Sequence, residues 1–159
     1  MSILVLGLGN LLMTDDALGS RVIETLERRF TFPAQVALLD GGTLGLDLLP
    51  RLEGIDKLLV VDALEMDAAP GTLFRLAGDE VPRAFAGKLS VHQMGLQDLL
   101  AVAELLGHLP AQLVVWGAQA ASIEMGTELS AALAPALERV VEAVVGELAG
   151  WGAAPSPAA

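Results

Sequence analysis

The sequence predicts one α/β domain, built on an open parallel sheet with helices on both faces. Strand-like and helix-like segments alternate along the 159 residues, which is the pattern of repeated βαβ units. Hydrophobic residues make up 53% of the chain, and the mean hydropathy is +0.59. Most strand-like segments are continuous apolar runs, as expected for parallel strands that are covered on both faces.

Each expected strand is a short apolar run that is bounded by glycine, proline or a polar residue. In chain order, the expected strands are Ile3–Leu8, Val36–Leu39, Lys57–Val61, Thr72–Leu76 and Gln112–Trp116. The second run stops at Asp40-Gly41-Gly42, the third at Asp62 and the last at Gly117. Thr72–Leu76 alternates apolar and polar residues, so it is the expected edge strand.

The expected helices lie where apolar residues recur at helical spacing. In chain order, they are Asp15–Phe30, Leu44–Leu52, Gly95–Leu106 and Leu129–Leu148. Thr14 or Asp15 is the expected N-cap of the first helix, because either side chain accepts hydrogen bonds from backbone N–H groups. Pro135 indicates that the last helix starts or kinks at that position. Residues 77–90 lack periodicity and are expected to be rich in loops.

The expected domain covers residues 1–149, and residues 150–159 are expected to form a disordered tail. The tail contains Pro155 and Pro157 and lacks apolar periodicity. No apolar run approaches the roughly 20 residues of a membrane span. The first residues also lack the basic region and the cleavage site of a secretory signal. We therefore expect a cytoplasmic protein that does not bind membranes.

Charge and composition argue against several classes of function. The net charge of −11 argues against nucleic acid and against anionic membranes as partners. The chain has no cysteine, which excludes disulfides, a thiolate nucleophile and thiolate metal ligands. Gly-x-Ser-x-Gly and His-Glu-x-x-His motifs are also absent, so serine hydrolase and zincin chemistry have little support.

Three side chains suited to metal binding lie close to expected strand ends. Asp16 follows the first strand at the start of a helix, Asp62 ends the third strand, and His92 lies in a later loop. The functional crevice of an open parallel sheet lies outside the carboxyl ends of its strands. Two carboxylates and one imidazole there would suit a divalent transition ion. Asp15 competes with Asp16 for this role, since either acid can be explained as a helix cap.

A dinucleotide site is the alternative explanation of Gly7-Leu8-Gly9. That fingerprint needs a third glycine where this chain has Leu12, and a helix that begins directly at the loop. Here residues 10–14 intervene, so the glycines are better explained as a tight turn after a strand.

Several motifs distributed over residues 3–149 are specific in combination. They are Leu6–Leu12 (LGLGNLL), Asp15–Gly19 (DDALG), Asp40–Leu46 (DGGTLGL), Val61–Ala63 (VDA), Pro70–Thr72 (PGT) and Ser90–Gln93 (SVHQ), with a weaker similarity at Ser122–Ser130. With these motifs the chain resembles the nickel–iron hydrogenase maturation endopeptidases. The resemblance implies a twisted, mostly parallel sheet between helices, in agreement with the elements above.

The resemblance also implies an activity, a partner and a site. Members of this family remove a short C-terminal extension from the nickel–iron hydrogenase large-subunit precursor after nickel insertion. Their three metal-contacting positions correspond to Asp16, Asp62 and His92, although many members have glutamate at the first position. The resemblance further implies that nickel arrives with the substrate, so the isolated protein should hold metal weakly.

The chemistry expected from these residues is hydrolysis by water, because no motif for an activated side-chain nucleophile is present. Nickel held by the triad would fix the scissile bond or polarise it, and a carboxylate not bound to metal would act as general base. Asp40, Gly41 and Gly42 are expected to line the groove for the substrate tail. Two alternatives remain open: a nickel-binding chaperone or checkpoint protein that does not cleave the precursor, and a metal-dependent hydrolase of small amides.

Overall fold

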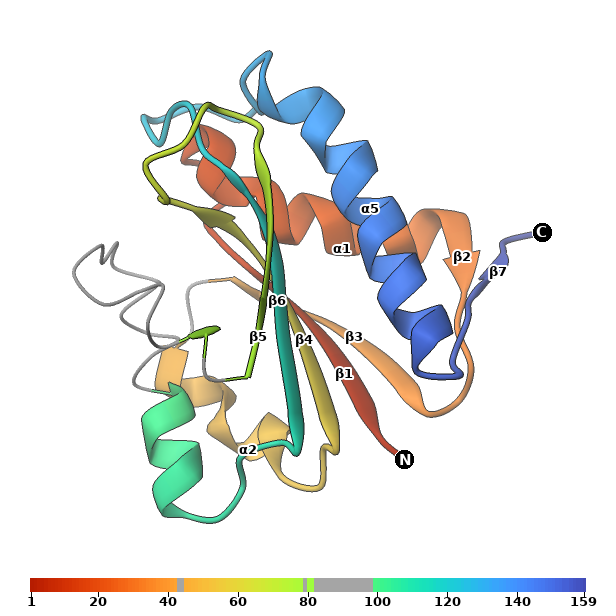
Figure 1. Ribbon diagram of the computed structural model, residues 1–159. Helices are drawn as coiled ribbons and strands as arrows, with labels where there is room; N and C mark the ends of the chain where they lie inside the picture. The colour runs from red at the N-terminus through yellow and green to blue at the C-terminus, as the bar shows by residue number, and fades with distance from the viewer. Residues whose placement is uncertain (43–44, 79, 82–98) are drawn as a thin grey trace.

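The apolar runs of the sequence form a five-stranded sheet in the computed structural model, which describes residues 1–42, 45–78, 80–81 and 99–159 (Figure 1). The strands are β1 (Ile3–Leu8), β3 (Val36–Gly42), β4 (Lys57–Leu64), β5 (Leu73–Ala77) and β6 (Gln112–Gln119). Their order across the sheet is β3-β1-β4-β6-β5. Neighbouring strands are parallel except β5, which pairs with β6 in the antiparallel direction. The predicted edge strand and the predicted fold class are both confirmed.

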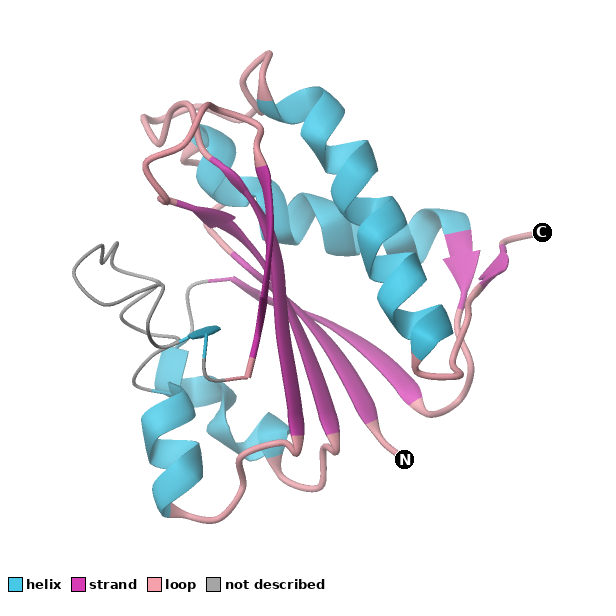
Figure 2. Ribbon diagram, viewed as in Figure 1, coloured by secondary structure: helices cyan, strands magenta, loops and turns pink. Residues whose placement is uncertain are grey.

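Helices cover both faces of this sheet, as Figure 2 shows. On one face lie α1 (Leu18–Arg29) and α5 (Leu133–Gly150), and on the other lie α2 (Leu49–Leu52) and the helical residues 99–105. Side chains of β4 alternate between the two resulting cores, because successive residues of a strand point to opposite faces. Leu59 and Val61 belong to the core under α1 and α5, whereas Leu58 and Val60 belong to the other.

Three parallel strands extend three residues further than predicted, to Gly42, Leu64 and Gln119. The sequence prediction stopped each strand at its first aspartate or glycine. In the structure, pairing with the neighbouring strand continues past these residues, and Asp62 is in register with Gly117. The prediction that Asp62 terminates its strand is therefore wrong, because ladder pairing outweighs the weak strand propensity of the two residues.

The helix ends also differ from the prediction. The 3₁₀ turn η1 (Thr14–Ala17) precedes α1, and the N-cap residue Ala17 makes no side-chain cap hydrogen bond. Neither Thr14 nor Asp15 caps the helix, since both side chains bind a distant loop. Pro135 lies in the first turn of α5, where a missing N–H costs no intrahelical hydrogen bond.

Other predicted segments are described only in part. The predicted helix at residues 44–52 appears as the 3₁₀ turn η2 (Gly45–Leu48) followed by α2, and residue 44 lies outside the described residues. Residues 95–98 of the next predicted helix, and 79 and 82–90 of the predicted loop, lie outside them as well. None of the helices in the described ranges is long and apolar enough to cross a membrane.

The C-terminal residues pack against the domain, which differs from the expected disordered tail. Ala153 is buried, and its N–H donates to the carbonyl of Leu148 over 2.8 Å, which closes α5. Trp151 packs on the core under α5, with Lys57 over its ring. Further on, β7 (Ser156–Pro157) pairs with β2 (Phe30–Thr31). Local composition missed this docking because the partners of these residues are distant in sequence.

We expect deletion of residues 151–159 to lower the melting temperature, since it exposes core side chains that Trp151 and Ala153 cover. A loss of about 2 kcal/mol corresponds to roughly 4–8 °C for a chain of this size. Deletion of residues 154–159 is the matched control and should have a smaller effect. Equal melting temperatures for all three proteins in a calorimeter would contradict this docking.

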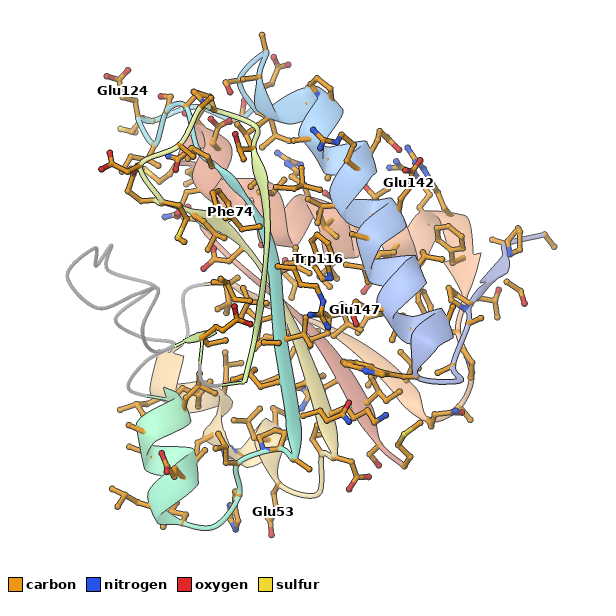
Figure 3. All side chains as sticks on the ribbon, viewed as in Figure 1. Glu53, Phe74, Trp116, Glu124, Glu142 and Glu147 are labelled. Atoms are coloured by element: carbon orange, nitrogen blue, oxygen red, sulfur yellow. The ribbon has the colours of Figure 1, made fainter. Side chains whose placement is uncertain are left out.

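A charged contact joins α5 to the edge strand β5. Figure 3 shows Glu147 beside Trp116, whose indole N–H donates to the Glu147 carboxylate over 3.1 Å. Arg75 of β5 donates to the same oxygen. Burial raises the pKa of Glu147, but the hydrogen bonds from Arg75 and Trp116 and the charge of Arg75 outweigh it, so the pKa is lowered.

A carboxylate with a lowered pKa stabilises the fold above its ordinary pKa of about 4.3, and this contribution disappears as the pH falls through the folded-state value. We expect Glu147→Gln to lower the unfolding free energy at pH 7 by up to about 1 kcal/mol, since Arg75 is partly exposed. The difference from the wild type should vanish in acid. Glu142→Gln, an exposed position on the same helix, is the control, and a difference that persisted at low pH would argue against the charged contact.

Candidate active site

The loop after β1 brings η1 to the carboxyl edge of the sheet. Gly19, in the first turn of α1, lies so close to the strands that a Cβ there would be 2.2 Å from the Leu8 carbonyl oxygen and 2.3 Å from that of Val61. Gly9 has φ +141°, and a Cβ there would lie 1.8 Å from the Asp16 carbonyl oxygen. Both positions therefore require glycine, and together they hold Asp16 close to β1 and β4.

Asp16 is half-buried at this edge. Its carboxylate accepts a hydrogen bond of 3.2 Å from the N–H of Asn10, in the loop after β1. Its own N–H donates to the carbonyl of Met13 over 3.1 Å, within the turn. Because η1 lies against β4, Asp16 is near the strand that carries Asp62.

Asp62 is fully buried near the carboxyl end of β4. Its neighbours Val61 and Ala63 belong to the core under α1 and α5. Strand alternation therefore directs the Asp62 side chain to the opposite face, where residues 99–105 pack. A Cβ on Gly117, its partner in β6, would lie 2.2 Å from the Asp62 carbonyl oxygen, so β6 approaches this residue closely.

Asp15 has a different environment from Asp16. It is fully buried, and its carboxylate accepts four hydrogen bonds from the loop after β6. The donors are the N–H groups of Ala121 at 2.8 Å, Ser122 at 3.0 Å and Ser130 at 2.7 Å, and the Ser130 hydroxyl at 2.8 Å. Both oxygens are occupied by these donors, so the geometry favours Asp16 over Asp15 as a ligand.

The third member of the expected triad, His92, lies outside the described residues. Within the parts of the chain that the structure describes, no three His, Cys, Asp or Glu side chains are grouped to hold a metal ion. The structure thus brings Asp16 and Asp62 to neighbouring elements. A site with two carboxylates there needs a further ligand from elsewhere in the chain or from a substrate.

Asp40, Gly41 and Gly42 form the end of β3, on the other side of β1. The exposed Asp40 accepts hydrogen bonds from the Ser20 hydroxyl at 2.7 Å and from the Gly42 N–H at 3.0 Å. Gly41 is the extra residue of a bulge opposite β1, and a Cβ on it would lie 2.8 Å from Leu6. Core packing accounts for Gly41, whereas Asp40 and Gly42 lie at the same carboxyl edge as the candidate site.

Gln119 is a buried polar residue that sequence analysis missed. Its side-chain carbonyl accepts hydrogen bonds from the N–H groups of Met66 at 2.7 Å and Ala68 at 3.3 Å. Its amide donates to the Glu65 carboxylate over 3.0 Å. Gln119 therefore shapes the loop that follows Asp62. The sequence did contain a signal for this residue, because Gln119 is polar and follows the apolar run of β6, at the same carboxyl edge as the aspartates.

The fold and these residues define a class: an α/β protein with carboxylates gathered at the carboxyl edge of its parallel strands. The family model of the hydrogenase maturation proteases matches residues 20–147. The hydrogenase 2 maturation protease of Escherichia coli is 42% identical over 149 residues, which cover 91% of each chain. The chain therefore belongs to the hydrogenase maturation protease family.

Other relatives and solved structures agree with this assignment. The hydrogenase expression/formation protein HupD of Rhodobacter capsulatus is 42% identical over 94% of this chain and 72% of its own length. The structure of the hydrogenase maturating endopeptidase HybD from E. coli matches with a TM-score of 0.94 and 39% identity, and the match covers 99% of this chain and 98% of that one. The structure of HybD from Thermococcus kodakarensis matches with a TM-score of 0.76 and 28% identity, and the match covers 91% of this chain and 97% of that one.

The two adjacent aspartates should respond differently to substitution. We expect Asp15→Ala to lower the unfolding free energy by roughly 3 kcal/mol, because several buried donors lose a charged acceptor. Asp16→Ala should change it by less than about 1 kcal/mol, since this side chain is only half-buried. Urea unfolding of the two variants measures this directly. Equal losses would show that Asp16 is also a structural residue.

Proposed function

We propose that this protein is an endopeptidase that removes the C-terminal extension of a nickel–iron hydrogenase large-subunit precursor after nickel insertion. The observation that carries the proposal is the 42% identity to the E. coli hydrogenase 2 maturation protease over nine-tenths of both chains. The carboxylates at the sheet edge supply acid–base and metal-binding groups for such a reaction. The absence of cysteine and the net charge of −11 support a cytoplasmic location without nucleic acid or membranes as partners.

We further propose that Asp16, Asp62 and His92 bind the nickel that the precursor carries. The donor set supports this assignment, because carboxylates and imidazole are ligands for divalent ions such as nickel. Three protein ligands leave coordination positions for groups of the precursor, so nickel would act as part of the substrate. The half-buried position of Asp16 leaves part of its side chain accessible to a bound chain.

The reaction proposed for this site is hydrolysis of one peptide bond. A water oxygen bonds to the carbonyl carbon, the C–N bond breaks, and the leaving nitrogen takes a proton. Asp16 or Asp62 serves as general base wherever its carboxylate is not occupied by metal. Nickel held by Asp16, Asp62 and His92 would supply Lewis-acid chemistry, which would polarise the carbonyl or the water and help to fix the scissile bond. Asp40 and Gly42, at the neighbouring strand end, bind the extension that is removed, and Gly41 leaves room for the close packing of β3 on the core.

The test is to incubate the purified protein with nickel-loaded precursor and to measure the mass of the large subunit. Loss of the extension is expected with the wild type and with Asp16→Glu, which keeps the carboxylate. Asp16→Ala and Asp62→Asn should each reduce the cleavage rate by more than roughly 100-fold. Loss of a residue that only supports a metal ligand reduces activity by up to about that factor, and loss of a ligand should cost more.

Glu53→Ala, an exposed position at the opposite edge of the sheet, is the control for this experiment. An unchanged large-subunit mass with the wild type, together with tight binding of the precursor, would instead indicate a chaperone or checkpoint protein. Cleavage of small amides without the precursor would indicate the hydrolase alternative.

A further inference from the structure

An exposed apolar surface lies beside the candidate site. It consists of Leu11 and Leu12, in the loop after β1, and Ile123 and Met125, in the loop after β6. Their exposed fractions are 41%, 60%, 56% and 84%. We call these four residues the two-loop surface. Large apolar side chains presented together on a protein surface are typical of a contact with another chain.

The two loops are held together as one unit. The Thr14 N–H donates to the Gly126 carbonyl over 3.0 Å, and the Gly126 N–H donates to the Leu12 carbonyl over 2.9 Å. The Asp15 carboxylate anchors the base of the second loop through Ala121 and Ser122. The backbone under the exposed side chains is therefore already ordered, and a preorganised surface binds a partner with a smaller entropic cost.

Among the described residues, charge around the two-loop surface is mostly acidic, although Arg21 of α1 donates to the Thr127 carbonyl in the second loop over 2.8 Å. The two loops, residues 9–17 and 119–130, and the nearby loop 64–72 contain no Lys or Arg and six Asp or Glu residues. Four of these acids are exposed, whereas Asp15 is buried and Asp16 is half-buried. Figure 3 shows Glu124 at the tip of this region. Acidic groups around an apolar centre complement a partner segment that has apolar residues flanked by basic ones.

The position of the surface relates it to the reaction. Leu12 lies in the loop that leads into η1, and Met13 bridges to Gly126 directly before the turn that carries Asp16. We propose that the two-loop surface docks an apolar, basic-flanked segment of the hydrogenase large-subunit precursor and so delivers the scissile bond to Asp16. This inference rests on the proposed function and names the part of the protein that selects the substrate.

The test compares two double variants with equal loss of exposed apolar surface. Leu12→Ser with Met125→Ser alters the two-loop surface. Leu105→Ser with Leu106→Ser is the control, because these leucines are 85% and 55% exposed and lie before β6, at the opposite edge of the sheet. The first variant should raise both the Kd for nickel-loaded precursor and the KM by about tenfold or more. Its kcat should stay within about twofold of the wild type, and the control should match the wild type throughout.

A charge-reversal pair tests the basic flanks of the partner. Glu124→Lys should weaken precursor binding at low salt, and the effect should shrink as salt increases. Glu53→Lys, at the other end of the molecule in Figure 3, should not weaken binding. Melting temperatures equal to that of the wild type would exclude misfolding as the cause, because all substituted positions are exposed.

Each outcome decides the inference. Unchanged Kd and KM in the two-loop variant would overturn it, even if the wild type cleaves the precursor. If the wild type binds the precursor without cleaving it, and the two-loop variant no longer binds, the docking surface would be supported and the proposed protease activity rejected. No binding and no cleavage by the wild type would reject both. If the wild type is a dimer and the two-loop variant is a monomer, a second copy of the chain covers the surface. That result would overturn the inference.

Discussion

The buried carboxylate of Asp15 is the interaction on which the candidate site depends. It accepts four hydrogen bonds from the loop after β6, across more than 100 positions of sequence. A buried carboxylate is tolerated only when its oxygens are satisfied by donors, and here three backbone N–H groups and one hydroxyl meet that need. The loop after β1 and the loop after β6 are thereby joined, and Asp16 is held in the turn between them and the sheet.

The parallel sheet supplies the second constraint. Because β1, β4 and β6 run in the same direction, their carboxyl ends and following loops meet at one edge. Gly19 permits α1 to start directly above β1 and β4, and Gly117 permits β6 to approach Asp62. Gln119 then shapes the loop beyond β4. This convergence places the buried Asp62 and the half-buried Asp16 on adjacent elements, and the proposed site for peptide hydrolysis rests on that arrangement.

The fold class could be predicted from the sequence because the apolar runs of β1, β4 and β6 are long and the helices between the strands are amphipathic. The predicted ends of β3, β4 and β6 came too early, because strand ends depend on pairing with neighbours such as Gly117, which local composition does not reveal. Similarly, Asp15 or Thr14 was predicted to cap the first helix, whereas both side chains bind a loop that is distant in sequence. The docking of Ala153 was missed for the same reason. Asp16 and Asp62 were selected from residue type and strand position, and they do lie on adjacent elements.

Under the function proposed above, the nickel carried by the precursor completes the site formed by Asp16, Asp62 and His92. The most direct measurement compares the nickel-loaded precursor with the same precursor freed of metal, and follows the mass of the large subunit over time. We expect cleavage of the nickel-loaded form alone, because the three proposed ligands include no thiolate and would retain metal only weakly without the precursor. Equally fast cleavage of the metal-free precursor would contradict this role of nickel and would leave Asp16 and Asp62 as acid–base carboxylates.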